Sequence, residues 1–527
     1  KVYSPGLFHD MDKAVKRIIK AIQNKEAILI YGDNDVDGMT AASLLTEFFR
    51  QLRVNVFFYI QSSATQKKDI ISDALQYALK HNCSLIITVD CGITAAKAIE
   101  HVDKHDVDVI ITDHHEPTSK IPHCVATLNP KLFNSTYPNR DITGVGVAFK
   151  LAHAVTNYLI ENGDIKSTII DLKKFLDLVA LGTISDMGAL LDENRIFVRY
   201  GLKQLRKTKR MGLMKLFHIC EINYPQLTTI DIASKIAPRL NSLGRIADPR
   251  KGVELLLVRN ENAASRLAQE LDIYNLERQK IERQASENID NYIKTHPEIL
   301  ANKAIVLYSD KWHPGIIPII TARISKHYNR PCMLIAIENG IGKGSMRTIP
   351  EFPLLHVLKE NEGILINFGG HDFAAGLTIR EENIPIIKKS FINAANAKLK
   401  DPDVISKLYL DSKVNFSDLT FDFMESLCLL EPYGNENPPP LLYCDARQVW
   451  FPKIVGKSHL KLYLEQDDRM LEGIGFGMAQ KRSLLKRKNI QLRVAFTPYI
   501  NTFLNKSSIQ LQIRDFQVLE NINYQLQ

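Results

Sequence analysis

Carboxylate and imidazole side chains follow three apolar runs near the start of the chain. The runs are Ala27–Tyr31, Leu85–Val89 and Val107–Ile111, and each is typical of a buried strand. The side chains that follow them are Asp33, Asp35, Asp37, Asp90, Asp113, His114 and His115. Because the carboxyl ends of parallel strands meet at one edge of a sheet, we expect these groups to share a crevice there. Asp186 follows a predicted helix through Leu181–Ser185 and could complete the group.

The predicted crevice would collect more negative charge than a metal-free site tolerates. Carboxylates placed together repel one another, which raises their pKa values until some of them hold a proton. A divalent cation removes that repulsion, and oxygen ligands with imidazole suit manganese or magnesium better than zinc. With this many ligands we expect two ions about 3.5–4 Å apart, which polarise a phosphodiester and generate hydroxide from water.

Two other interpretations of the acidic motifs compete with a catalytic metal site. The pattern Asp33-x-Asp35-x-Asp37-Gly38 also begins calcium-binding loops, but the stretch where their closing glutamate is expected, Met39–Leu45, is apolar and has a helical pattern. Aspartate and glycine are also common turn residues after strands. Turn chemistry explains one such motif more easily than four, three of which stand at strand ends.

The elements that position these groups alternate between apolar runs and segments of helical period. Thr40–Arg50 and Ala95–His101 are such helical segments, and further helices are predicted at Asp171–Leu181 and Arg199–Leu205. This alternation predicts an α/β domain with a mostly parallel sheet and helices on its faces.

A long polar helix is predicted from about Ala263 to Lys294. Its narrow apolar stripe consists of Leu267, Leu271, Tyr274, Ile281, Ala285, Ile289 and Tyr292. A stripe this narrow suits a connector between domains that packs along one side only. A coiled-coil dimer helix is the alternative, although Arg278 interrupts its seam.

A second α/β unit is predicted from about Ala304, with strands at Ile305–Tyr308 and Cys332–Ile337 and a helix at Ile316–His327. After about Lys400 the chain changes to short strand-like runs. These are Ala446–Trp450, Leu460–Leu464, Leu471–Phe476, Ile490–Thr497 and Ile509–Phe516. Five short strands suit a small β-barrel such as an OB-fold, and a sandwich would give the same pattern.

Bulk properties bound the remaining possibilities. The chain has 527 residues, more than one hydrophobic core usually supports, so we expect two to four domains. A net charge of +8 permits a polyanionic partner without requiring one. The seven cysteines occur singly, which argues against a disulfide framework and favours a reducing cytoplasm. No apolar run is long enough to span a bilayer, and the residues after Lys1 lack the apolar core of a signal peptide.

The acidic motifs resemble the four-motif signature of the DHH phosphoesterase superfamily, in order and in strand context. Gly144–Lys150 is similar to the Gly-x-Gly-Val-Ala helix start of that family. The resemblance implies that the metals are bound by Asp35, Asp37, Asp90, His114 and Asp186. It implies that Asp90 bridges two ions and that Asp33 either ligates or supports a ligand.

The same resemblance implies roles beyond metal binding. Asp113 is expected to orient the ring of His114, as carboxylates do for metal-bound imidazoles, and His115 to face the substrate phosphate. Asn34 stands where relatives often carry an aromatic residue, which alters the substrate surface without removing a ligand. The catalytic residues are predicted to be Asp37, Asp90, His114, His115 and Asp186.

Later segments resemble one branch of the superfamily, the RecJ-like exonucleases, through to about Phe516. They are Ala237–Arg245, Trp312–Ile317, Gly344–Pro350, Gly369–Gly376, Glu431–Gly434 and Gly456–Lys461. Predicted substrate-binding residues from these segments are Arg239, Asn241, Arg245, Ser345, Arg347 and His371. Arginine grips phosphate oxygens with a planar fork, although Arg239 could instead form a salt bridge at a domain interface. Lys457, His459 and Lys461 could form a basic track for a DNA backbone or a simple solvated face.

The resemblance implies a 5′-to-3′ exonuclease that removes 5′-mononucleotides from single-stranded DNA in repair and recombination, with a helicase and a single-strand-binding protein as partners. It implies a DHH domain at residues 1–205, a helical connector at 206–300, a DHH-associated domain at 301–400 and an OB-type domain at 401–527. An oligoribonuclease or a cyclic-dinucleotide phosphodiesterase is one alternative, but such enzymes usually lack the last domain. A metal-dead replication scaffold is another, but such proteins lose acidic ligands that this chain keeps.

Overall fold

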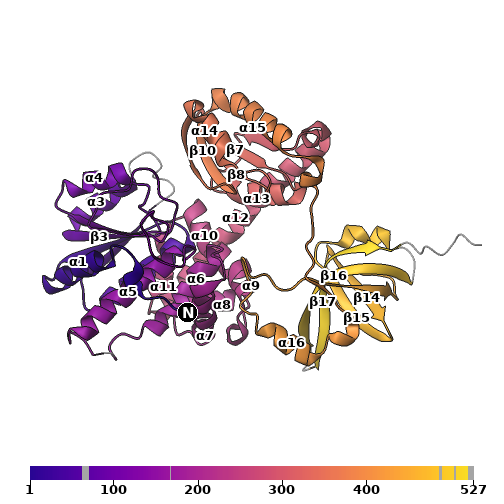
Figure 1. Cartoon of the computed structure of the whole chain (residues 1–527), viewed down its shortest axis with the longest axis horizontal. Helices are drawn as coiled ribbons and strands as arrows, with labels where there is room; N and C mark the ends of the chain where they lie inside the picture. The colour runs from indigo at the N-terminus through magenta and orange to yellow at the C-terminus, as the bar shows by residue number, and fades with distance from the viewer. Residues whose placement is uncertain (62–69, 167, 486–488, 504–505, 520–527) are drawn as a thin grey trace, which may run out of the picture. The chain divides into compact units, whose positions relative to one another are not determined.

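The computed structural model of the chain describes residues 1–61, 70–166, 168–485, 489–503 and 506–519 (Figure 1). The chain divides into two compact units. The first comprises Lys1–Gly188 and Asp192–Ser406, and the second comprises Ala189–Leu191 and Lys407–Gln527. The finer predicted boundaries after residues 205, 300 and 400 remain predictions, and residues 520–527 of the last predicted domain lie outside the described residues.

The first sheet of the larger unit has five parallel strands in the order β2-β1-β3-β4-β5. Its strands are β1 (Ala27–Gly32), β2 (Val56–Ile60), β3 (Cys83–Val89), β4 (Asp108–Thr112) and β5 (Ala126–Leu128). β1, β3 and β4 are the three predicted strands and lie side by side. Because all pairings are parallel, their carboxyl ends lie at one edge, as predicted.

Helices cover both faces of this sheet. They are α1 (Met11–Gln23), α2 (Val36–Gln51), α3 (Ile70–Lys80), α4 (Ala96–Asp103) and α5 (Gly144–Glu161). Leu29 and Tyr31 of β1 share a core with Ala78 of α3 and Ile99 of α4, while α5 contacts α1 and α2. The predicted parallel α/β fold is therefore confirmed.

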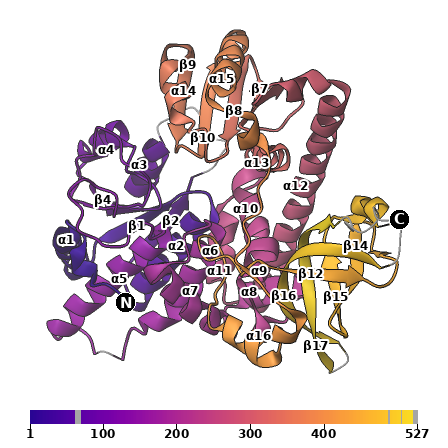
Figure 2. The same ribbon diagram turned by 45° about the vertical axis from the view of Figure 1, so that its right-hand side comes forward.

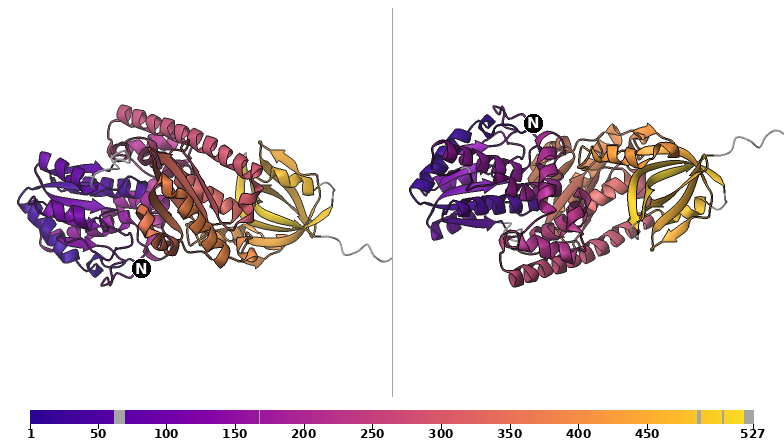
Figure 3. Two further views of the ribbon diagram at one scale, coloured as in Figure 1. Left: turned by 90° about the horizontal axis from the view of Figure 1, so that it is seen from above. Right: turned by 90° about the horizontal axis from the view of Figure 1, so that it is seen from below.

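A helical region follows in the same unit. Its helices are α6 (Leu176–Ser185), α7 (Asp192–Leu205), α8 (Met211–Ile219), α10 (Ala237–Ile246), α11 (Arg250–Leu257) and α12 (Glu261–Thr295). α12 has 35 residues, as the long polar segment predicts, and begins where the Asn260 side chain accepts a hydrogen bond from the Ala263 N–H (2.9 Å). Figure 3 shows it as one unbroken helix.

The two halves of α12 pack against different partners. The first half contacts α8 and α10, whereas Ala285, Ile289 and Ile293 of the second half join the core of the second sheet. Tyr292, predicted as part of the stripe, is exposed, and Ile293 takes that place. Arg278 is buried and donates hydrogen bonds to Asn275 and Glu282 of the same helix.

The second sheet of this unit is mixed, in the order β6-β7-β8-β10-β9. Its strands are β6 (Ile305–Ser309), β7 (Cys332–Glu338), β8 (Ile341–Arg347), β9 (Leu365–Gly370) and β10 (Ala374–Arg380). α13 (Ile317–Tyr328) packs on one face, and α14 (Leu355–Glu360) and α15 (Ile384–Lys398) pack on the other. The sequence patterns predicted β6, β7 and α13 but not the three glycine-containing strands.

In the described part of the smaller unit, seven strands form one sheet, and helix α16 (Phe421–Cys428) accompanies it (Figure 2). The strands are β11 (Ser412–Lys413), β12 (Leu442–Gln448), β13 (Lys453–Val455), β14 (His459–Gln466), β15 (Arg469–Gly475), β16 (Ile490–Phe503) and β17 (Lys506–Val518). An additional pairing of β12 with β14 gives each strand of the series β12-β16-β17-β15-β14 two neighbours within that series. β12 ends at Gln448, so Trp450 lies beyond the strand predicted for it. Among the described residues no helix combines the length and apolarity that a membrane crossing requires.

Candidate metal centre

The loop after β1 is shaped by hydrogen bonds to its own carboxylates. Asp35 caps α2, and its side chain accepts a hydrogen bond from the Gly38 N–H (3.1 Å). Asp37 lies in the first turn, where its carboxylate accepts from the Gly144 N–H (2.6 Å) and the Val145 N–H (2.9 Å) at the start of α5. Both carboxylates are thereby oriented by backbone N–H groups at helix N-termini, which favour negative charge.

Asp90 follows β3 directly and is buried in an unusual state. Its backbone is left-handed (φ 60°), its side chain is 1% exposed, and neither carboxylate oxygen has a hydrogen-bond partner among the residues that the structure describes. A Cβ at Gly144 would lie 2.5 Å from Asp90 Oδ1, so α5 approaches this carboxylate as closely as glycine allows. A buried carboxylate without a partner is costly unless a cation compensates it.

His114 lies at the centre of the carboxylates. Its Nε2 atom is 3.0 Å from Asp90 Oδ1, 3.8 Å from Asp186 Oδ2 and 3.9 Å from Asp37 Oδ2. The approach to Asp90 lacks hydrogen-bond geometry, so within the described part of the chain this buried nitrogen also has no hydrogen-bond partner. Asp186 reaches the site from another element, as the C-cap of α6.

Three overlapping groups of potential ligand atoms result, each with its atoms within 4.8 Å of one another. They are Asp33, Asp35 and Asp90; Asp37, His114 and Asp186; and Asp90, His114 and His115. The structure therefore brings together every residue predicted to bind metal. Asp90 and His114 each belong to two groups, which fits the bridging position predicted for Asp90.

The pKa values of these groups indicate uncompensated negative charge. Burial, followed by the charge of Asp35, raises the pKa of Asp33 and that of Asp186 to about 7. Burial and neighbouring carboxylates also raise the pKa values of Asp37 and Asp90 well above their usual range. Burial lowers the pKa of His114 to about 3, so its ring is neutral at physiological pH. Neutral imidazole, carboxylate oxygens and unpartnered buried atoms together fit Mn²⁺ or Mg²⁺.

The structure corrects the role predicted for Asp113. Its Oδ1 atom accepts hydrogen bonds from the backbone N–H of His114 (2.7 Å) and from Nδ1 of the His115 ring (2.8 Å), and Oδ2 accepts from the Ile93 N–H (2.9 Å). Asp113 therefore orients the ring of His115, and it holds His114 only through the backbone.

A cavity of about 280 Å³ adjoins the centre. Asp33, Asp90 and His115 line it from the first sheet, and Gly370 and His371 line it from the end of β9. His371 thus lies where the sequence motifs predict a contact with substrate.

A second cavity of about 460 Å³ contains other predicted substrate-binding residues. Arg245, His313, Lys343 and Ser345 are among the residues that line it. Arg245 donates a hydrogen bond to the Gly315 carbonyl (2.9 Å), and Arg347 donates one to the Ser345 hydroxyl (3.2 Å). Arg245 and Ser345 thus line the cavity, and Arg347 contacts Ser345.

Two predicted substrate contacts are engaged elsewhere. The Arg239 guanidinium forms a salt bridge with Asp272 of α12 (2.8 Å), but both residues lie in the helical region of one unit and not at the domain interface of the predicted alternative. The Asn241 side chain accepts from the Val36 N–H at the start of α2 (3.3 Å) and so supports the acidic loop.

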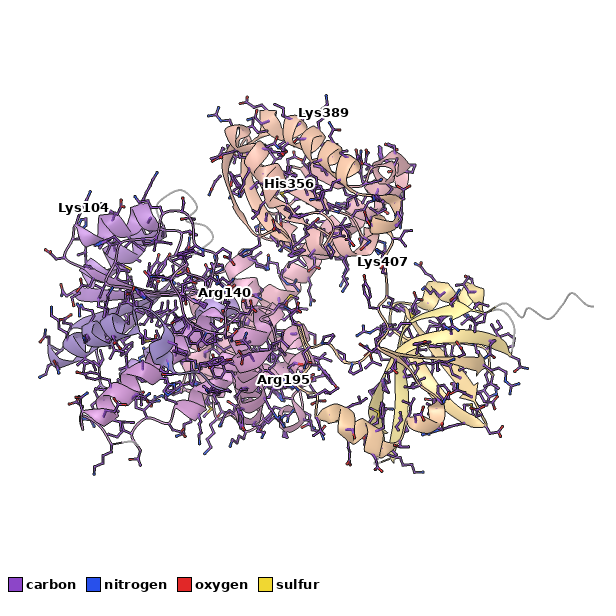
Figure 4. All side chains as sticks on the ribbon, in the orientation of Figure 1. Lys104, Arg140, Arg195, His356, Lys389 and Lys407 are labelled. Atoms are coloured by element: carbon purple, nitrogen blue, oxygen red, sulfur yellow. The ribbon has the colours of Figure 1, made fainter. Side chains whose placement is uncertain are left out.

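Lys131 is a site residue that the sequence patterns do not reveal. Its charge acts on both His114 and Asp186, and its ammonium group lies 3.3 Å from a Glu116 carboxylate oxygen. Its carbonyl accepts a hydrogen bond from Arg140 (3.3 Å), which Figure 4 labels. A single lysine in a loop has no spacing from which this position could be inferred.

Three family models match the chain. The DHH family, N-terminal domain, matches residues 27–183, the DHHA1 domain matches residues 301–401, and the RecJ OB domain matches residues 410–515. The last match confirms the OB-type assignment of the C-terminal strands.

Two relatives and a solved structure match nearly the full chain. The single-stranded-DNA-specific exonuclease RecJ of Bacillus subtilis is 33% identical over 98% of this chain and 64% of the relative. Its namesake in Haemophilus influenzae is 31% identical over 97% of this chain and 91% of the relative. The crystal structure of RecJ in complex with Mn²⁺ from Thermus thermophilus has a TM-score of 0.81 at 26% identity, covering 98% of this chain and 72% of that chain. The chain thus spans less than two thirds of the Bacillus relative and most of the Haemophilus relative.

Proposed function

The chain belongs to the RecJ family of single-stranded-DNA-specific exonucleases, and we propose that it hydrolyses single-stranded DNA from the 5′ end and releases 5′-mononucleotides. The observation that carries this proposal is that the buried Asp90 oxygens and the buried Nε2 atom of His114 face one another among further carboxylates, with no hydrogen-bond partner among the described residues. Such a group is stable only with cations, and it stands beside a cavity lined by imidazoles.

In this proposal two Mn²⁺ or Mg²⁺ ions would be held by the clustered carboxylates and His114. Their ligands are Asp35, Asp37, Asp90, His114 and Asp186, with Asp33 as a further candidate and Asp90 shared between the groups. When bound, such ions polarise the phosphodiester and lower the pKa of the attacking water. Asn241 and the N–H groups of Gly144 and Val145 keep the acidic loop in place.

His115 contributes a positive charge next to the phosphate site. Burial alone would lower the pKa of its imidazole, but the hydrogen bond that the ring donates to Asp113, together with the negative charge there, outweighs burial and raises the pKa to about 9. The ring is therefore an imidazolium at neutral pH, and it shares a cavity with His371. We assign to these two side chains the orientation of the phosphate that is cleaved.

The second cavity provides contacts for the rest of the strand. Arg245 and Lys343 supply positive charge, and Ser345 and Arg347 supply hydrogen-bond donors on β8. Groups of this kind bind phosphate oxygens irrespective of base sequence.

The C-terminal unit offers a surface suited to bases and backbone. Trp450 and Phe476 are half exposed, and the ring of Phe476 meets His459 edge-on at 5.0 Å. Lys453 and Lys461 both lie over the ring of Tyr463, at 5.7 and 5.3 Å from its centre. Aromatic rings interleaved with lysines bind single strands by stacking and charge.

The wider setting is also part of this proposal. A helicase and a single-strand-binding protein would supply the single strand on which such an enzyme acts. All seven cysteines are free, which fits action in a reducing cytoplasm.

A DNA oligomer labelled at its 5′ or its 3′ end tests the activity, with Mn²⁺, an RNA of equal sequence and the Asp90→Ala variant as comparisons. We expect immediate release of a labelled mononucleotide from the 5′-labelled DNA only, and no release by the variant. Preferential cleavage of short RNA would place the protein among oligoribonucleases. Strand binding without any cleavage would identify it as a scaffold.

A further inference from the structure

The helix that carries Asp186 ends in a hydrogen-bonded left-handed turn. The Met187 N–H donates to the Ile184 carbonyl (3.3 Å) and the Gly188 N–H donates to the Thr183 carbonyl (2.9 Å), which is the Schellman pattern. Met187 adopts φ 56° at the position that glycine usually occupies. A side chain at this position is strained, so neighbouring contacts must stabilise the turn.

The residues just beyond this turn belong to the C-terminal unit. Ala189–Leu191 group with Lys407–Gln527, and the Leu190 side chain is 2% exposed. The Leu190 N–H donates to the Asn435 carbonyl (2.9 Å), and a Cβ at Gly434 would lie 2.5 Å from Leu190 Cδ1. Leu190 is therefore held by one backbone hydrogen bond and by a surface that requires glycine.

The segment that contacts Leu190 is stabilised by its own hydrogen bonds. Gly434 and Asn437 exchange backbone hydrogen bonds of 2.9 and 3.2 Å. The Asn437 side chain donates to the carbonyls of Pro432 (2.8 Å) and Leu430 (3.0 Å). These hydrogen bonds fix the conformation of the turn against which Leu190 packs.

Asp186 is the carboxylate that lies next to these contacts along the chain. Its side chain is 28% exposed, compared with 0% for Asp37 and 1% for Asp90, so packing restrains it less than it restrains those two. On its other flank, a Cβ at Gly188 would lie 2.6 Å from Thr143 Cγ2, so the chain runs tightly past the start of α5. Only Met187, Gly188 and Ala189 separate Asp186 from Leu190.

We propose that Leu190, seated against Gly434, is a positioning residue for Asp186. By anchoring the chain beyond the left-handed turn, it keeps the Asp186 carboxylate within ligand distance of His114 and Asp37. The inference rests on the proposed function, since it takes Asp186 as a metal ligand.

The test measures Mn²⁺ binding to the full-length, DNA-free protein by electron paramagnetic resonance of free Mn²⁺. Leu190→Ala and Gly434→Val are expected to lower the affinity for one of the two Mn²⁺ ions about tenfold and to leave the affinity for the other unchanged. Saturating Mn²⁺ is expected to restore kcat, and binding of single-stranded DNA in EDTA is expected to remain as in the unmodified protein. Leu190→Met, which keeps the side-chain volume, should bind both ions normally.

Gly473→Ala is the matched control within the C-terminal unit. A Cβ there would lie 2.5 Å from Ile513 Cδ1, so it disturbs the same core away from Leu190, and it should bind both ions normally. Wild-type Mn²⁺ affinity in Leu190→Ala would overturn the inference. Equal weakening in Gly473→Ala would also overturn it, because general loosening of the unit would then explain the effect. Asp186→Asn separates the two proposals: if it binds both ions normally, the ligand assignment of the proposed function is what fails.

Discussion

Asp90 combines several features that are unfavourable in the absence of a metal ion. Its carboxylate is buried beside other carboxylates, its oxygens lack partners, and its backbone occupies the left-handed region. Each of these features destabilises the metal-free fold and makes sense only if a cation is part of the native protein.

Asp90→Asn should separate stability from activity. Removal of the buried charge is expected to raise the free energy of unfolding of metal-free protein by about 1–3 kcal/mol. Mn²⁺ should no longer stabilise the variant, and exonuclease activity should fall at least about a thousandfold, as expected when a metal-bridging group is lost. Denaturant unfolding with EDTA or Mn²⁺ measures the first two effects, and a variant less stable than the parent in EDTA would contradict the argument.

The stability of metal-free protein should decrease between pH 6.5 and 8.5. Asp33 and Asp186 have pKa values of about 7 in the fold, well above their unfolded values of about 4, so the folded state holds extra protons that are lost as pH rises. His115, raised to about 9, acts in the same direction, although its side chain is 45% exposed and solvent screening weakens its effect. His114, lowered to about 3, acts oppositely but only below about pH 6.5.

The expected decrease is on the order of 2 kcal/mol over this range, since each shifted carboxyl contributes roughly 1 kcal/mol. Denaturant titrations in EDTA at several pH values measure it. Protein saturated with Mn²⁺ is the control, and it should show no decrease because the ions replace the protons.

Residue types and spacing predicted which groups assemble here, but not every contact within the site. Which of two adjacent histidines turns its ring toward Asp113 depends on backbone angles that sequence order does not contain. Arg239 and Arg245 belong to one motif, yet six residues along a helix place them about 120° apart around its axis. One of them therefore lines the cavity while the other pairs with Asp272.

At the scale of elements, helix α5 must come unusually close to the end of β3. Gly144→Ala would place a methyl group 2.5 Å from Asp90 Oδ1. We expect this variant to lose about 1–3 kcal/mol of stability from overpacking, and at least about tenfold in Mn²⁺ affinity because Asp90 must move. Calorimetry with and without Mn²⁺ measures both. Gly363→Ala, where no atom lies within 4 Å of the added Cβ, is the matched control.

The elements that the sequence predicts best are those in which apolar periodicity dominates. Strands β1, β3 and β4 of the first sheet and the long helix α12 have clear patterns, whereas β2 and β5 of the same sheet were not predicted. β8 and β10 contain glycines, which disfavour strand assignment, although packing requires them. A Cβ at Gly342 would lie 2.7 Å from the Ile335 side chain, so this strand can approach its neighbour only without a side chain there.

At the scale of the whole molecule, the proposed DNA surface of the C-terminal unit should reveal itself through salt dependence. Lys457 is exposed beside β14, and Lys457→Glu should weaken binding of single-stranded DNA several-fold and lower the slope of log affinity against log salt by about 1. Fluorescence anisotropy at several salt concentrations measures this. Lys389→Glu, an equally exposed position on α15, should bind like the parent, and equal effects of both changes would indicate only nonspecific charge.

The division into two units could not be predicted from linear patterns. Composition changes after about residue 400, and the second unit does begin its main segment at Lys407. The chain nevertheless contributes Ala189–Leu191 to that unit more than two hundred residues earlier. The sequence of these three apolar residues does not predict which distant segment they contact, because sequence patterns reflect only nearby residues along the chain.

The continuity of α12 restricts how this architecture can change in evolution. One inserted residue near its middle would turn the downstream half by about 100° and advance it by about 1.5 Å. Ile289 and Ile293 would then leave the core that they share with Ile320 and Leu334. Insertions of seven residues, close to two full turns, would preserve the facing of this half but lengthen the spacer by about 10 Å. Homologous chains should therefore vary freely in their surface loops while keeping the length of this helix nearly constant.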